Sequence, residues 1–252
     1  MRMIVRHILI TATLLIAASA CIAAPDECRL NISNSQKEKL KSLATETRRS
    51  TMRERESMRR ARYDLLQVFS SYTIDERKAK AAQEKISSAQ LNLLNIHLEN
   101  ELALRGLFNA TQFQQFRDMM KRHTRDSQTL VIAPPEEDIL DRLPNKEMLD
   151  ELGISADNQK LLTPSNRKLI LELRKLSAQT LEMYGNYSLD AASCRKLIGS
   201  IHKKQIELLS LQHRRQRTIR TVLSKDQFQS LQRELAKSMA KRNHTHRRDQ
   251  KP

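Results

Sequence analysis

Few residues of this sequence are spaced like catalytic or metal-binding groups. The chain contains no Gly-x-Ser-x-Gly, His-Glu-x-x-His or Cys-x-x-Cys motif, and these spacings are typical of acyl-transfer nucleophiles, zinc sites and redox pairs. Of its seven histidines, only His244 and His246 are spaced like a pair of ligands, whereas a metal site needs several fixed ligands. His97 and His213 are expected to be solvated or to cap helices. We therefore expect no enzyme and no cofactor, with His244 and His246 as the metal candidates.

A run of arginine and methionine is the second chemical feature. The segment 48–62 contains seven Arg and only three apolar residues, Met52, Met58 and Ala61. Such a run is most often a solvated helix face. Arg stems and flexible Met side chains also form an adaptable amphipathic surface. The candidate binding residues are Met52, Arg53, Arg55, Met58, Arg59 and Arg62.

Recurring helix starts must position these residues. The segments FNATQFQQF (108–116) and LSKDQFQSL (223–231) are near copies, and in each a cap residue is followed three positions later by Gln. This spacing predicts a capping box, in which both side chains accept from backbone N–H groups. Thr73 and Glu76 are expected to form another box. The other predicted capping residues are Ser33, Gln36, Asn109, Gln112, Thr163, Asn166, Ser224 and Gln227, with Ser155 and Asn158 as the alternative opening of the second half.

The two halves of the chain are an internal repeat. Tyr72 matches Tyr187 at a displacement of 115, whereas the openings LNISNSQ (30–36) and LGISADN (152–158) are displaced by 122. Repeat 2 therefore lacks seven residues, and the surplus lies in the first helix of repeat 1. The expected core stripe of the returning helix is Ile86, Ala89, Leu93, Ile96, Ala103 and Leu107. A second stripe, Leu91, Leu94, Leu98 and Leu102, becomes Ile206, Leu209, His213 and Arg217 in repeat 2.

Composition indicates an all-α protein. The chain has only four Gly, no Trp and 29% charged residues, which is typical of long helices. We expect one helix from Ser33 to about Ser70 and a last helix in each repeat, at 109 to about 123 and 224 to about 241. The predicted organisation is a signal peptide (1–24), repeat 1 (25–125), an acidic Pro-containing linker (126–151), repeat 2 (152–241) and a basic disordered tail (242–252).

The N-terminus has the organisation of a secretory signal. Arg2 and Arg6 precede an apolar run and then small residues, a pattern that predicts export by a cleavable peptide. A lipid-modified Cys21 is the alternative to a freely released product. Cleavage leaves no segment expected to span a membrane, and it lowers the formal charge from +16 to +14. Because export separates the chain from nucleic acid, no nucleic-acid partner is expected.

Four segments of the chain resemble the L-T-x-x-Q motif of the Spy/CpxP family of periplasmic stress proteins. Two are the openings Ile32-Ser33-x-x-Gln36 and Leu162-Thr163-Pro164-Ser165-Asn166, and two are the later near copies at 108–116 and 223–231. That family carries one motif before its first long helix and another before its last, and this chain resembles two such domains in tandem. The resemblance implies a thin, cradle-shaped antiparallel pair of helical hairpins in the periplasm. The sequence departs from the motif at Asn109, where the family has Thr.

The resemblance implies an ATP-independent chaperone that binds unfolded or misfolded client proteins, here on the Met/Arg run. The alternative is an envelope-stress or metal-sensing regulator that acts on a sensor kinase. Since the chain holds both hairpins, we expect a monomer with pseudo-two-fold symmetry, packed as an intramolecular pseudo-dimer. Export also permits a disulfide between Cys28 and Cys194, although two Cys at non-equivalent positions of the repeats do not predict one.

Overall fold

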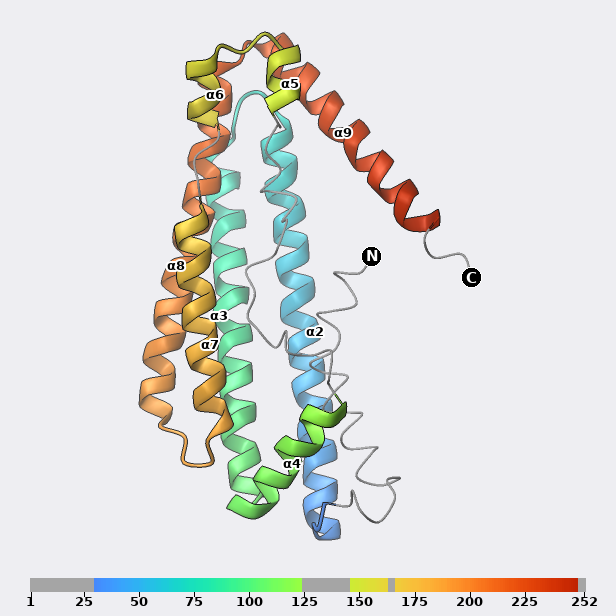
Figure 1. The fold of residues 1–252 in the computed structure, drawn as a ribbon, viewed down its shortest axis with the longest axis vertical. Coiled ribbons are helices and arrows are strands. Elements are labelled where there is room, and N and C mark those ends of the chain that lie inside the picture. The colour runs from blue at the N-terminus through green and yellow to red at the C-terminus, as the bar shows by residue number, and fades with distance from the viewer. Residues whose placement is uncertain (1–29, 124–145, 163–165, 249–252) are drawn as a thin grey trace.

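The computed structural model of the protein describes residues 30–123, 146–162 and 166–248, without the side chains of 121–123, 146–147 and 238–248 (Figure 1). Every regular element in these ranges is an α-helix, which confirms the predicted all-α class. The helices are α2 (Asn34–Ser70), α3 (Glu76–Leu107), α4 (Ala110–His123), α5 (Lys146–Glu151), α6 (Ala156–Leu162), α7 (Arg167–Gly185), α8 (Ala191–Val222) and α9 (Lys225–Arg248).

Three helices begin at predicted capping boxes. At α2, the Ser33 hydroxyl accepts from the Gln36 backbone N–H at 3.2 Å, and the Gln36 side chain accepts from the Ser33 N–H at 2.9 Å. Asn109 with Gln112 and Ser224 with Gln227 make the same reciprocal bonds. These bonds satisfy N–H groups that have no partner inside the helix.

The predicted Thr73–Glu76 box is wrong, whereas the alternative opening of the second half at Ser155 is confirmed. Helix α3 begins at Glu76, and the Asp75 carboxylate, rather than Thr73, accepts from the Lys78 N–H at 3.0 Å. A carboxylate next to the helix start is favoured there by the helix dipole. In repeat 2, the Ser155 hydroxyl accepts from the Asn158 N–H at 3.4 Å and opens α6.

The first helix of repeat 2 is interrupted where that of repeat 1 is continuous. Helix α6 ends at Leu162 and α7 begins at Arg167. Asn166 is the cap residue of α7 but makes no side-chain cap hydrogen bond. Thr163, its predicted partner in a capping box, lies outside the described residues. The interruption coincides with the seven-residue deletion and with Pro164, which disfavours a helical residue before it.

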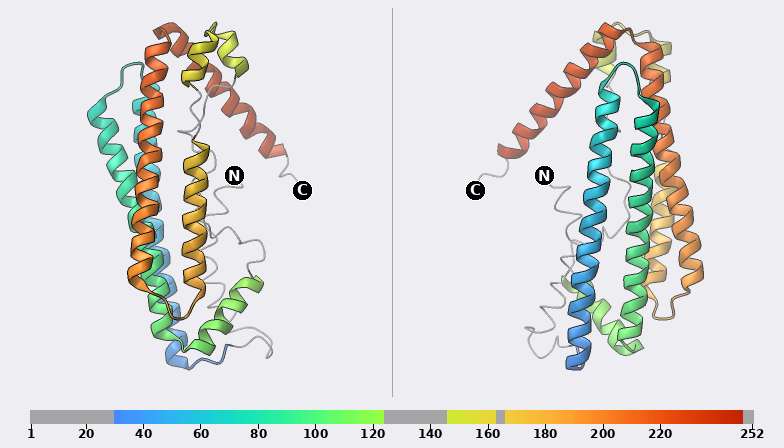
Figure 2. Two further views of the ribbon diagram at one scale, coloured as in Figure 1. Left: turned by 60° about the vertical axis from the view of Figure 1, so that its left-hand side comes forward. Right: turned by 180° about the vertical axis from the view of Figure 1, so that it is seen from behind.

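The long helices form two hairpins that pack side by side. Figures 1 and 2 show α2 paired with α3 and α7 paired with α8, and α3 packs on α8 between them. The α2–α3 turn lies at one end of the molecule and the α7–α8 turn at the other. Helix α4 crosses one end, whereas α9 leaves the opposite end at an angle to the hairpins. None of the helices in the described ranges is long and apolar enough to cross a bilayer.

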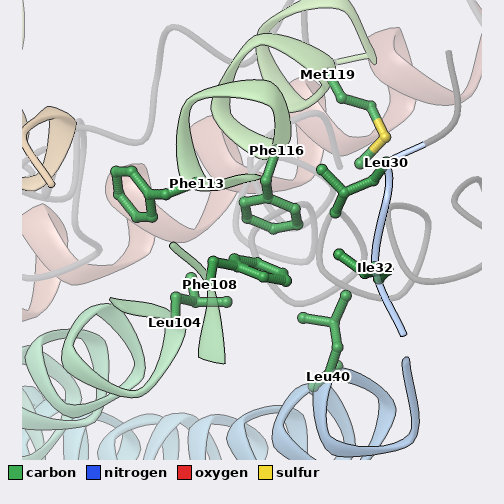
Figure 3. Close-up of a cluster of buried hydrophobic side chains, with 9 residues drawn as sticks. Leu30, Ile32, Leu40, Leu104, Phe108, Phe113, Phe116 and Met119 are labelled. Atoms are coloured by element: carbon green, nitrogen blue, oxygen red, sulfur yellow. The ribbon is translucent and has the colours of Figure 1, made fainter. Parts of the chain in front are cut away.

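Each end of the bundle is closed by an equivalent apolar cluster. In repeat 1, α4 turns back so that Phe113 and Phe116 meet Phe108 and the chain before α2 (Figure 3). This cluster contains Leu30, Ile32, Leu40, Ala44, Leu104, Phe108, Phe113, Phe116 and Met119. In repeat 2, the corresponding cluster contains Leu149, Ile154, Leu162, Ile219, Leu223, Phe228 and Leu231.

The middle of the bundle is built from both repeats. Leu209 of α8 joins the cluster of α2 and α3 around Leu65, Phe69 and Ile86. Leu94 and Leu98 of α3 join the cluster of α7 and α8 around Tyr184. The second stripe of α3 is therefore core, because α8 covers it. In the predicted first stripe, Ile86 and Ala89 are buried, Leu93, Ile96 and Leu107 are half-buried, and the prediction for Ala103 is wrong because it is exposed.

Hydrogen bonds between the hairpins come in pairs displaced by 115 residues. The Arg105 guanidinium donates to the carbonyl oxygens of Tyr184 and Asn186 at 2.8 and 2.7 Å. The Arg220 guanidinium donates to those of Phe69 and Ser71 at 2.6 and 2.7 Å. Each arginine thereby satisfies carbonyl groups at the C-terminal end of the other repeat's first helix. Burial lowers the pKa of Arg220 to about 10.

The tyrosines of the two turns also form a pair of hydrogen bonds displaced by 115 residues. The Tyr187 hydroxyl donates to the Phe108 carbonyl at 2.9 Å, and the Tyr72 hydroxyl donates to the Leu223 carbonyl at 3.0 Å. Between the two ends, Ser87 Oγ lies 2.8 Å from His202 Nε2, and these residues are themselves 115 apart. These arginine, tyrosine and Ser87–His202 contacts of one hairpin on the other are therefore reciprocal.

Two predicted boundary segments contain more helix than expected. The last part of the predicted linker forms α5, and its Leu149 is fully buried in the repeat 2 end cluster. Helix α9 continues to Arg248, so the predicted disordered tail is helical over 242–248. The signal-peptide prediction and most of the linker lie outside the described residues.

Candidate functional site

The six predicted binding residues lie in the middle of α2 but not on one face. Met52 is 57% exposed, and the Arg53 and Arg59 side chains are 76% and 77% exposed. Arg55 and Arg62 are half-buried. Met58 is half-buried against the cluster that contains Leu65 and Phe69. Met52, Arg53 and Arg59 are therefore the accessible members of the set.

Tyr63 extends the accessible surface and was missed from the sequence. Its side chain is 62% exposed, the largest exposure among the large apolar residues in the described ranges. Met52, Glu56, Arg59 and Tyr63 are spaced i, i+4, i+7 and i+11, which places them on one helix face. We call these four residues the α2 stripe. The same spacing in the sequence was the signal that could have found Tyr63.

Ion pairs hold the charged members of the α2 stripe. Glu56 accepts from Arg60 Nε at 2.7 Å and from Arg59 Nη2 at 2.7 Å. These hydrogen bonds, Arg60 first, lower the pKa of Glu56. Such exposed i, i+3 and i, i+4 pairs are weak and screened by salt. The stripe therefore presents one carboxylate and one guanidinium group between two exposed apolar side chains.

A polar layer lies beneath this part of α2. The Thr47 hydroxyl lies 3.1 Å from Asn100 Oδ1 inside the α2–α3 contact, and Thr51 is also buried. Half-buried His97 follows on α3, and burial followed by the charge of Arg55 lowers its pKa to about 4. The imidazole is therefore neutral near pH 7. Small and polar side chains here separate the apolar clusters at the ends and middle of the hairpin.

The helix histidines differ from the expected solvated or capping groups. His97 lies in the α2–α3 contact, and His213 Nε2 lies 2.9 Å from a Glu76 carboxylate oxygen with its ring against Phe69. In the described part of the chain, no three His, Cys, Asp or Glu side chains gather in a way that could hold a metal. The side chains of His244 and His246, the metal candidates, lie outside that part.

The candidate disulfide joins one described and one undescribed residue. Cys194 is a free thiol, fully buried in the cluster with Tyr184 and Ile198, and burial raises its pKa. Cys28 lies outside the described residues. Within the described residues, the Cys194 side chain therefore serves as core packing, at the position that repeat 1 fills with buried Ala79.

Comparison of the chain with protein-family models, with curated proteins and with solved structures gave no match.

Proposed function

We propose that the protein is a periplasmic, ATP-independent chaperone that holds unfolded client proteins on the α2 stripe. The observation that carries the proposal is the exposure of Met52 and Tyr63 on the same helix face as Arg59, with Arg53 and Arg60 beside it. Exposed apolar side chains and arginine stems on one helix face form an adaptable amphipathic surface. Unfolded chains expose apolar segments next to carboxylates, which this combination complements.

The charged and the apolar side chains act at different steps of client binding, the first in attraction and the second in contact. Guanidinium groups attract an acidic segment over a distance of about 8 Å at physiological ionic strength. Contact then buries Met52 and Tyr63, and full burial of such a side chain is worth about 1.5 to 3 kcal/mol. Two apolar side chains give weak, reversible binding, which suits release without ATP.

The proposal includes the architecture. We propose that the chain is a tandem member of the Spy/CpxP family whose repeats pair as an intramolecular pseudo-dimer. The reciprocal bonds of Arg105 and Arg220 and of Tyr72 and Tyr187 support this pairing. The capping boxes at Ser33, Asn109 and Ser224 support the motif assignment.

An aggregation-suppression assay with purified protein tests the function. Met52→Ser combined with Tyr63→Ser removes the exposed apolar groups, and we expect most of the suppression to be lost. Leu171→Ser combined with Ile206→Ser is the matched control, because these side chains are 53% and 42% exposed on the other hairpin. Equal loss in both variants, or no suppression by the wild-type protein with several clients, would contradict the proposal. A sensor role would then be the better explanation.

A further inference from the structure

The contact between α3 and α8 contains an ionic group, centred on Glu76, that the repeat does not duplicate. Glu76 of α3 lies 2.9 Å from His213 Nε2 and 3.4 Å from Arg217 Nε of α8. His213 is also held by Phe69, whose ring centroid is 5.7 Å away, and by Gln83 at 3.4 Å. This contact joins the start of α3 to the second half of α8.

The equivalent contact at the other end of the interface is apolar. A displacement of 115 replaces Glu76 by Ala191, His213 by Leu98 and Arg217 by Leu102. Leu98 is buried in the cluster with Tyr184, and Leu102 packs against that cluster. The interface is therefore reciprocal in its arginine and tyrosine bonds but not in its ion pairs, which join Glu76 to Arg217 near one end and Glu99 to Arg195 near the other.

We propose that Glu76, His213 and Arg217 are pairing-specificity residues, which make the α8 surface of repeat 2 accept repeat 1 and reject a second repeat 2. The partner that this surface fits is repeat 1, from the same chain or from a second copy. The inference rests on the proposed intramolecular pairing of the repeats.

Like repeats would mismatch their charges. If two copies of repeat 1 paired, each half-exposed Glu76 would face Leu98 and Leu102 and lose its contacts with the Arg217 guanidinium and the His213 ring. If two copies of repeat 2 paired, each Arg217 would meet Ala191 in place of a carboxylate, and His202 would meet a second His202 in place of Ser87. Specificity of this kind comes from penalising the wrong partner.

Complementary charge reversals in the full-length protein test the inference. Glu76→Arg and Arg217→Glu each place like charges in the contact within their own chain. In a mixture, repeat 1 of the first variant matches repeat 2 of the second, and the two unaltered repeats also match. We expect each variant alone to be monomeric and the equimolar mixture to form a swapped dimer, measured by light scattering and native mass spectrometry.

The effective concentration within one chain and the cost of the mismatched charges together allow the repeats to exchange partners. Joining two binding units in one chain gives them an effective concentration in the millimolar range. The Glu76 and Arg217 side chains are 52% and 65% exposed, so replacing their attraction by repulsion should weaken pairing by about tenfold. Two mismatches then shift the balance by about a hundredfold, and the mixed dimer should form at tens of micromolar protein.

Two controls separate the possible failures. Glu76→Arg combined with Arg217→Glu in one chain should be monomeric and regain most of the thermal stability that each single change loses. Asp157→Lys mixed with Lys160→Glu, which reverse an exposed ion pair inside α6 with its charged groups 3.0 Å apart, should give no dimer. A wild-type chain that is an obligate dimer would overturn the intramolecular pairing. A monomeric wild type with a mixture that stays monomeric, or with equal dimer in the control mixture, would overturn the pairing rule.

Discussion

At the scale of single residues, side chains that looked alike in the sequence have unlike roles. Met52 is exposed, whereas Met58, one and a half turns away, packs on the core. The five guanidinium groups of Arg53, Arg55, Arg59, Arg60 and Arg62 divide in the same way between solvent and the inner side of the helix. Helical position, rather than residue type, therefore decides which of them can meet a partner.

His97 leads to a prediction about how the free energy of unfolding depends on pH. Its pKa is lowered from 6.5 to about 4 by burial and then by Arg55. The unfolded chain therefore binds the proton more readily, and the free energy of unfolding falls as the pH is lowered from about 6.5 towards 4. The loss attributable to His97 should be of the order of 1 to 3 kcal/mol, since one pKa unit corresponds to about 1.4 kcal/mol.

Urea unfolding at pH 7 and pH 4.5 measures this loss. The variant His97→Leu removes the titrating group, so its unfolding free energy should change less between the two pH values than that of the wild type. An equal change in both proteins would show that other groups carry the acid sensitivity.

At the scale of helices, local signals were predictable and tertiary ones were not. The boxes at Ser33, Asn109 and Ser224 were predictable because each is completed within four residues of the chain. The role of the Leu94 and Leu98 stripe was not, because it depends on which helix covers it, and α8 lies more than a hundred residues away. Tyr63 was missed because it lies one residue beyond the charged run 48–62, although its spacing from Met52 places it on the same helix face.

The caps give a prediction at this scale. Ser224 accepts from the Gln227 N–H at 3.2 Å, whereas the Asn166 side chain makes no cap bond. Ser224→Ala should therefore lower the free energy of unfolding by about 1 kcal/mol, a usual value for a lost cap. Asn166→Ala, the matched control, should change it by less than about 0.5 kcal/mol. Equal effects in chemical denaturation would show that the hydrogen bond does not account for the stability at Ser224.

At the scale of the whole molecule, the repeat organises both the fold and its asymmetry. The arginine and tyrosine contacts that join the hairpins are kept in both copies. The first helix differs between the two copies, because α2 is continuous and its counterpart in repeat 2 is divided into α6 and α7. The continuous helix carries the α2 stripe, whereas at the equivalent positions repeat 2 has Leu171 in place of Glu56 and Ala178 in place of Tyr63. Duplication thus supplied the shared core, and divergence left the proposed binding face in one copy.

This asymmetry leads to a prediction about salt. Arg53→Ser combined with Arg59→Ser should slow the capture of an acidic client at low ionic strength, because attraction between exposed charges speeds encounter. At about 1 M salt the Debye length falls to about 3 Å, so the variant and the wild type should capture at nearly equal rates. Burial of Met52 and Tyr63 is not screened, and the dissociation rate should change much less. Stopped-flow fluorescence with a labelled client measures both rates.

Lys203→Ser combined with Arg214→Ser is the control for net charge. Both residues are exposed on α8, and the double change removes the same charge as the α2 variant. If capture depends on the α2 stripe, this control should keep most of the wild-type rate, and circular dichroism should show equal helix content in all three proteins. An equal slowing by both variants would mean that the overall positive charge attracts the client, with no preferred face. A rate that does not respond to salt in the wild type would instead remove the electrostatic step and leave apolar contact as the basis of capture.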